Sequence, residues 1–198
     1  TTSNGVINIV AAGNMTTGSW GGGDILSTSG GTGSITLATT AGGTMALSDS
    51  ISSAEGGLVT FTNAGILTIS APITARGGLT QNGAGAVTLG ADIITTADPV
   101  SFLRAVTLGA DVSIDTTNSG GSSAGANITF QNTLNGAQAL TLYGGTGGTI
   151  TFTGAVGGPA LTGLTVSSAL STVFTSTASF TGPVSITSNE INLNGGAS

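Results

Sequence analysis

The octapeptide Ala86-Val-Thr-Leu-Gly-Ala-Asp-Ile93 recurs in the sequence as Ala105-Val-Thr-Leu-Gly-Ala-Asp-Val112. Its centre is an apolar–Thr–apolar triplet, and triplets with Thr or Ser in the middle recur along the sequence. They include Ile35–Leu37, Val59–Phe61, Leu67–Ile69, Val100–Phe102, Ile128–Phe130, Leu140–Leu142, Ile150–Phe152, Leu164–Val166 and Val184–Ile186. In a strand, neighbouring side chains face opposite ways, so each triplet turns two apolar side chains inward and one hydroxyl outward. No stretch keeps a 3.6-residue period, which predicts an all-β protein with almost no helix.

The spacing of the triplets predicts how the strands are arranged. Members of three series follow one another at a nearly constant interval: Leu67, Val87, Val106, Ile128 and Ile150; Val59, Leu79 and Val100; and Leu140, Leu164 and Val184. A coil of this length cannot bury its apolar face alone, whereas stacked coils share a continuous core. We therefore expect a parallel β-helix, or β-solenoid, with right-handed coils of about 20 residues. About nine or ten coils would form a rod of roughly 45 Å at the strand spacing of ~4.8 Å.

This arrangement predicts ladders of like residues inside the rod. We expect Val87, Val106, Ile128 and Ile150 in one ladder, and Leu89, Leu108, Phe130 and Phe152 in the next. Turns between coils need positive φ, which Gly supplies, as do the Asn-Gly steps at Asn4, Asn82, Asn135 and Asn194. We treat 1–198 as one solenoid domain, with 1–33 its least regular part and the polar segment 116–127 a protruding loop.

The composition excludes several classes of function. The 198 residues include 35 Gly, 35 Thr and 23 Ser, but only two Arg, no Lys, eight acidic residues, no His and no Cys. Such a chain offers no basic patch for nucleic acid, no zinc site of the usual ligands and no imidazole or thiolate for catalysis. The mean hydropathy of +0.42 opposes disorder. No apolar run reaches the ~18 residues that insertion into a membrane requires.

Two stretches carry a family resemblance. They are Gly125-Ala-Asn-Ile-Thr-Phe-Gln-Asn-Thr-Leu-Asn-Gly-Ala-Gln-Ala-Leu-Thr-Leu-Tyr143 and Gly147-Gly-Thr-Ile-Thr-Phe-Thr-Gly-Ala-Val-Gly-Gly158, the second followed by Leu161–Ser168. Both resemble the repeat region of large bacterial exoproteins similar to filamentous haemagglutinin. The resemblance spans roughly 59–193 and implies a secreted β-helical rod that acts in adhesion or in surface layers. It carries over no catalytic residue.

The carboxylates are the remaining candidates for chemistry. Asp92 and Asp111 occupy matching positions of the octapeptide, so stacked coils would bring two like charges near ~5 Å. They would then splay into solvent, be compensated by Arg104, or bind a cation such as Ca²⁺. Together with Asp115 and Arg104 they form the one cluster that a polysaccharide lyase or hydrolase could use. A single Arg without Lys is poorly suited to such catalysis, so we expect no enzyme, no cofactor and no resident metal.

Three short patterns have simpler explanations than the functions they suggest. The stretch Gly121–Gly125 matches the G-x-S-x-G nucleophile motif, but its Ser has no His to act as a base. The cluster Gly144–Gly148 is followed by neither Lys nor a helix start, so turn glycines explain it better than a phosphate cradle. The acceptor patterns at Asn14 and Asn127 would be silent in a bacterial protein.

A row of outward hydroxyls and the two ends of the rod are the candidate interaction surfaces. We expect Thr88, Thr107, Thr129 and Thr151 in one ladder that could bind a surface glycan or ice. The strands near the termini carry no Lys or Pro to block pairing, and they suggest self-assembly through Val6, Ile7, Ile9, Val10, Ile191 and Leu193. The leading interpretation is an extracellular or cell-surface structural protein, a shaft or fibre subunit joined end to end by strand pairing. A glycan- or ice-binding module is the alternative, and a polysaccharide-active enzyme is the third.

Overall fold

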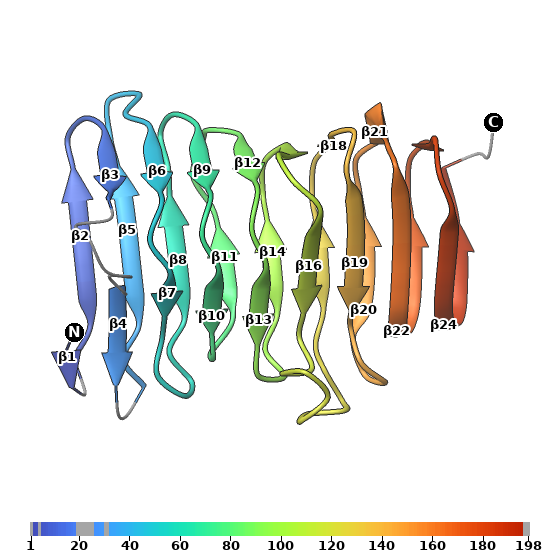
Figure 1. The fold of residues 1–198 in the computed structure, drawn as a ribbon, viewed down its shortest axis with the longest axis horizontal. Helices are drawn as coiled ribbons and strands as arrows, with labels where there is room; N and C mark the ends of the chain where they lie inside the picture. Colours follow the sequence, from blue (N-terminus) through green and yellow to red (C-terminus); the bar gives the residue numbers. More distant parts are fainter. Residues whose placement is uncertain (1, 4, 19–25, 30–31, 196–198) are drawn as a thin grey trace.

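The computed structural model describes residues 2–3, 5–18, 26–29 and 32–195. Within these ranges the chain forms 24 strands and no helix, which confirms the predicted all-β solenoid. Figure 1 shows the strands side by side along the long axis, in chain order from one end to the other. About eight turns of roughly 22 residues make up the rod, so the turns are fewer and slightly longer than we predicted. Residues 19–25 and 30–31 of the predicted irregular segment 1–33, and the Asn4 step, lie outside the described residues.

The rod has three faces, and most coils contribute one short strand to each of them. The strands within a face are parallel to one another. The first face contains β1 (Thr2–Ser3), β4 (Leu26–Ser29), β7 (Ile51–Ser52), β10 (Ile73–Ala75), β13 (Ile93–Thr95), β16 (Val112–Asp115) and β19 (Ala139–Tyr143). The second contains β2 (Ile7–Ala11), β5 (Ile35–Thr39), β8 (Val59–Thr62), β11 (Leu79–Gln81), β14 (Val100–Phe102), β17 (Ile128–Phe130) and β20 (Thr149–Phe152). The third contains β3 (Met15–Thr17), β6 (Met45–Leu47), β9 (Leu67–Ile69), β12 (Val87–Leu89), β15 (Val106–Leu108), β18 (Leu134–Asn135), β21 (Val156–Leu161) and β23 (Ala178–Phe180). The long strands β22 (Gly163–Phe174) and β24 (Val184–Leu193) each extend over both the first and the second face.

The register of the strands confirms two of the three predicted series. Val59, Leu79 and Val100 are partners on the second face, and Leu140, Leu164 and Val184 are partners on the first. In most triplets the two apolar side chains are buried and the hydroxyl between them is partly exposed. The triplet therefore works as predicted: its outer residues build the core and its middle residue faces solvent.

The predicted ladders that join Val106 to Ile128, and Leu108 to Phe130, are wrong. Val106 instead pairs with Leu134 on the third face, and Ile128 pairs with Val100 on the second. The segment 116–127 lengthens this coil, so the partners Val100 and Ile128 lie further apart in the sequence than the partners Leu79 and Val100. A prediction that assumes a constant spacing therefore joins third-face residues before this coil to second-face residues after it.

A single row of the core holds both an aromatic stack and a buried amide side chain that bonds to a second buried amide beside the row. On the second face Phe102, Phe130, Phe152 and Phe174 lie on successive coils, with ring centroids 5.5, 5.5 and 4.7 Å apart and ring planes within 15° of parallel. Gln81 takes the next position of the same row and is fully buried. Its Nε2 donates to Oδ1 of Asn63 at 2.7 Å, while Nδ2 of Asn63 donates to backbone carbonyls. The core therefore changes from aromatic to polar within one turn, with its amides paired.

Side-chain oxygens continue the inter-coil hydrogen bonding at the corners, where the strands stop. Each of these oxygens accepts a backbone N–H of the following coil at 2.7–3.2 Å. The acceptors are Asn14, Thr28, Thr39, Ser53, Gln81, Asp92, Asp111, Asn127 and Asn135. Because buried or half-buried N–H groups need an acceptor, these side chains allow the backbone to turn sharply at the corners.

The Asn-Gly steps fulfil the predicted role at one of the three described positions. Gly136 has φ of +116°, but Gly83 and Gly195 do not have positive φ. They lie instead against the backbone of the preceding coil: a Cβ on Gly83 would come within 2.2 Å of the Asn63 nitrogen. Close approach of coils, rather than backbone conformation, therefore requires glycine at Gly83.

Candidate functional site

The predicted self-assembly residues lie on the two end faces of the rod, with different exposures. The side chain of Ile9 points to the same side of its strand as the core residues, and Ile9 pairs with the fully buried Leu37. It is nevertheless 42 % exposed, because no described coil lies on its other side. At the other end of the rod, Leu193 pairs with the buried Phe174 and is 62 % exposed. Ile191 is likewise exposed. By contrast Ile7 is already buried, and Val6 and Val10 are exposed side chains beside the core row.

The four predicted hydroxyls do not form one ladder. Thr88 pairs with Thr107 on the third face, whereas Thr129 pairs with Thr151 on the second. The error has the same cause as the wrong apolar ladders, the longer coil that contains 116–127. The second face instead carries a longer outward row, with Thr36, Thr60, Thr80, Ser101, Thr129 and Thr151 on successive coils. The spacing of Val59, Leu79 and Val100 contained the signal for this row.

Asp92 and Asp111 are not stacked on each other. Asp92 lies level with Ser113 and accepts its N–H at 2.7 Å, and Asp111 accepts the N–H of Ala139 at 2.8 Å. Both carboxylates are exposed, as in the first of the three outcomes we considered, and each also accepts a backbone N–H of the next coil at a corner. In the described part of the chain, no group of three or more His, Cys, Asp or Glu side chains could hold a metal ion.

Among the described residues, neither arginine forms a salt bridge with these aspartates. The Nε of Arg104 donates to the Gly83 carbonyl at 3.1 Å, and Arg76 pairs with Glu55 at 3.7 Å on the surface. Near that pair, burial, and to a smaller extent the Glu55 carboxylate, raises the pKa of Asp98 above its usual value. The predicted catalytic cluster of Asp92, Asp111, Asp115 and Arg104 is therefore not assembled around one point.

Asp115 instead organises the loop that follows it. Its carboxylate accepts both the N–H and the hydroxyl of Thr117 at 2.6 Å, and the N–H of Ser119 at 2.8 Å. Thr117 also bridges to Thr96 on the neighbouring coil. Thr116, which we expected in the loop, is fully buried, and its hydroxyl bonds to the backbone carbonyls of Ala126 and Tyr143. The exposed part of the loop is held against the first face through Asp115.

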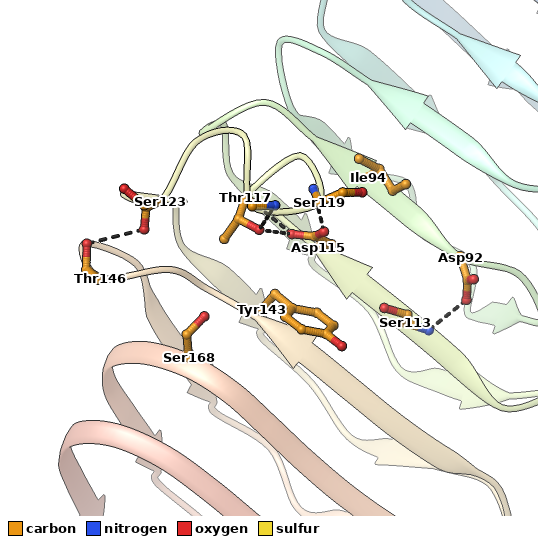
Figure 2. Close-up of a pocket in the computed structure, with 11 residues that line it drawn as sticks. Asp92, Ile94, Ser113, Asp115, Thr117, Ser119, Ser123, Tyr143, Thr146 and Ser168 are labelled. Atoms are coloured by element: carbon orange, nitrogen blue, oxygen red, sulfur yellow. Dashed lines mark hydrogen bonds between the residues drawn. The ribbon is translucent and has the colours of Figure 1, made fainter.

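Between this loop and the first face lies an open cleft of about 650 Å³. Figure 2 shows its side chains, which come from four successive coils, those of β13, β16, β19 and β22, and from the loop. The lining residues are Asp92, Ile94, Ser113, Asp115, Thr117, Ser119, Gly120, Ser123, Tyr143, Thr146 and Ser168. Asp92 and Asp115 were candidates from the sequence. Tyr143 and Ser168 were not, because the long segment 116–127 lies between Asp115 and its register partner Tyr143.

The two glycine-rich patterns have structural roles here. The carbonyl of Ser123, within the G-x-S-x-G match, accepts the N–H of Thr146 at 2.9 Å. In the cluster Gly144–Gly148, the N–H groups of Gly144, Gly145 and Gly147 donate to oxygens of neighbouring coils. These N–H groups are therefore committed to the fold rather than directed at a phosphate.

Comparisons with protein-family models, with curated proteins and with solved structures find no match to this chain. Among the described residues, no helix is present that is long and apolar enough to pass through a membrane. The β-helical repeat architecture is thus the level of classification that the structure supports.

Proposed function

We propose that this chain is a structural rod, a fibre subunit that stacks end to end with further copies of itself and carries no chemistry of its own. The observation that carries the proposal is the match between its two end faces. On the second face the core row that includes Phe174 ends at Leu193, and it begins at Ile9. The neighbouring row ends at Ile191 and begins at Ile7. A second copy placed coil on coil would bring Leu193 onto Ile9 and Ile191 onto Ile7.

Stacking of this kind is favourable in two ways. It covers Ile9, Ile191 and Leu193, each 42–62 % exposed, and burial contributes on the order of 1 kcal/mol for each half-exposed side chain. It also pairs strand edges: β2 and β24 each have one strand neighbour within the described ranges. The contact is heterologous, with one end of a copy on the opposite end of the next, so it continues indefinitely.

The setting we propose is outside the cell, as part of an adhesin-like bacterial surface structure. The resemblance of 125–143 and 147–158 to exoprotein repeats supports it. The low charge supports it too, because two basic and eight acidic residues oppose the close packing of copies only weakly. Ice binding is less well supported, because the three-residue strands of the second face turn a single hydroxyl outward and so form a narrow row rather than a flat array.

Blocking each end separately tests this proposal. In Ile9→Lys one end face carries a charge that stacking would bury, and in Leu193→Lys the other does. Each variant alone should remain a monomer by sedimentation velocity, and an equimolar mixture should form a dimer and nothing larger. The wild-type chain should form filaments with an axial repeat of about 40 Å in electron micrographs, from about eight turns spaced ~4.8 Å apart.

The matched controls place Lys on the same strands but facing outward. Asn8→Lys and Asn192→Lys lie beside the core-facing Ile9 and Leu193, and both should still form filaments. Monodisperse wild-type rods at high protein concentration would refute the proposal. So would filaments that persist in Ile9→Lys or Leu193→Lys.

A further inference from the structure

We propose that the cleft beside the loop 117–124 is a binding site for a neutral saccharide. This inference goes beyond the structural role and does not depend on it, because the residues that line the cleft (Figure 2) belong to the coils of β13, β16, β19 and β22 and not to the terminal strands β2 and β24. Its volume of about 650 Å³ is in the range of small-molecule sites, roughly 300–1,000 Å³. The cleft is the place where the otherwise regular face is interrupted by a long insertion.

The chemistry of the walls fits a polyhydroxylated ligand. Seven of the eleven lining residues carry a hydroxyl, which can both donate and accept. Asp92 is exposed, and Ser113 N–H uses one of its oxygens. A carboxylate has acceptor sites for about four hydrogen bonds, so Asp92 has capacity left to accept from sugar hydroxyls.

Tyr143 supplies the apolar surface that such a site needs. It is the single Tyr of the chain and is half-buried. Figure 2 shows its ring among the polar lining side chains, with Asp115 beside it. A flat ring with a hydroxyl at its edge offers an apolar face to the C–H groups of a pyranose and a polar handle to its hydroxyls.

The charge of the cleft selects against acidic ligands. None of the described residues that line it is basic, and two, Asp92 and Asp115, are acidic. Asp115 is 8 % exposed and already accepts three hydrogen bonds from the loop. An anionic sugar would therefore meet uncompensated repulsion from Asp92, whereas a neutral one would meet hydrogen-bond acceptors.

Three hydrogen bonds to the Asp115 carboxylate tie the start of the rim loop to the first face. Asn118 and Ser119 have φ of +53° and +57°, and Gly120 follows at +86°. Left-handed conformations at non-glycine residues are costly and persist where surrounding bonds enforce them, as Asp115 does here. A fixed rim reduces the entropy lost when a ligand binds.

Saturation-transfer NMR of the 198-residue chain tests the proposal, because it detects ligand binding to monomers and filaments alike. The probes are the neutral hexasaccharides of glucose, mannose, galactose and N-acetylglucosamine, and the acidic hexamer of galacturonic acid. We expect saturation of at least one neutral probe and none of the acidic one. Calorimetric titration with that neutral probe then gives its dissociation constant.

Two variants should weaken binding at least tenfold: Tyr143→Ala, which removes the ring, and Asp92→Asn, which keeps the size of the side chain and its acceptor for Ser113 N–H. The matched control is Asp111→Asn, because Asp111 makes the same corner bond outside the cleft, and its binding should equal wild type. Absence of saturation for all four neutral probes would overturn the proposal. Equal binding of the acidic probe, or unchanged binding in Asp92→Asn, would also overturn it. None of these results bears on filament formation, which Ile9→Lys and Leu193→Lys report separately.

Discussion

Phe130 and Phe61 provide a matched pair that measures what aromatic stacking adds to the solenoid core. Both lie in the same row of the second face and are at most 1 % exposed. The Phe130 ring stacks on Phe102 and on Phe152, at 5.5 Å on each side. The register partners of Phe61 are Leu37 and Gln81, neither of them aromatic. Replacement by Ala therefore removes the same buried side chain in two different surroundings.

The expected magnitudes follow from these surroundings. Truncating a buried Phe to Ala costs about 3–5 kcal/mol of unfolding free energy, from lost burial and the cavity left behind. Offset-stacked aromatic pairs contribute about 0.5–1.5 kcal/mol each beyond burial. Phe130→Ala loses two such pairs and Phe61→Ala loses none, so Phe130→Ala should be more destabilising by about 1–3 kcal/mol.

Urea unfolding followed by circular dichroism measures both variants against wild type. The comparison requires equal slopes against urea, because a change in slope indicates that unfolding is no longer one cooperative step. The substitutions Phe130→Leu and Phe61→Leu keep most of the apolar volume and should preserve the difference between the sites. Equal losses at the two positions would refute a stabilising role for the stack.

Three further substitutions test other parts of the rod. Gly83→Ala should destabilise by about 1–3 kcal/mol or more in urea unfolding, because its Cβ would meet backbone atoms of Asn63 at 2.2 Å, whereas Gly13→Ala, with open space around it, should change little. Gln81→Leu should cost about 1–3 kcal/mol by leaving Oδ1 of Asn63 without its partner, and the double variant with Asn63→Ala should lose less than the sum of the two single losses. Burial raises the pKa of Asp98 above its usual value, and Glu55 adds to this shift. The folded state therefore binds a proton more readily than the unfolded state, so the protein should become more stable as the pH falls through the folded-state pKa of Asp98. The gain is complete once the pH lies below the unfolded-state pKa. Asp98→Asn should accordingly be more stable than wild type at neutral pH and lose this part of the pH dependence; a pH profile identical to wild type would contradict it.

The fold could be predicted because its information is local. A triplet such as Val87–Leu89 contains both its strand and the direction of each side chain, and its recurrence at Val106–Leu108 indicates stacked parallel coils. The same reasoning failed where the repeat is not constant. Nothing in Ile128–Phe130 distinguishes a second-face strand from a third-face strand, since all three faces use the same triplet. Only the extra length of the coil that contains 116–127 decides it.

The cleft was out of reach of sequence reasoning for a related reason. Tyr143 lies next to Asp115 through a register that passes over the long segment 116–127, and Ser168 pairs with Tyr143 across a strand irregularity. Asp92 was noticed, but as a charge facing Asp111. Its actual neighbour, Ser113, becomes visible only when Ile93 is known to pair with Ile114, whereas the octapeptide repeat aligns Ile93 with Val112.

The corner bonds explain why a chain so poor in charge is also so rich in small polar residues. At these corners the strand pairing stops while the coil still approaches its neighbour closely, so an N–H of the next coil needs an acceptor from a side chain. Asn14, Thr28, Asn127 and Asn135 supply it with neutral oxygens, and Asp92 and Asp111 do so with carboxylates. A charged acceptor repeated on every coil would stack like charges ~5 Å apart, whereas a hydroxyl or amide can be repeated without repulsion. A long stack of such coils therefore requires that Asp be used rarely at these corners. It also requires that the Asp residues used there, Asp92 and Asp111, are not level with each other on successive coils.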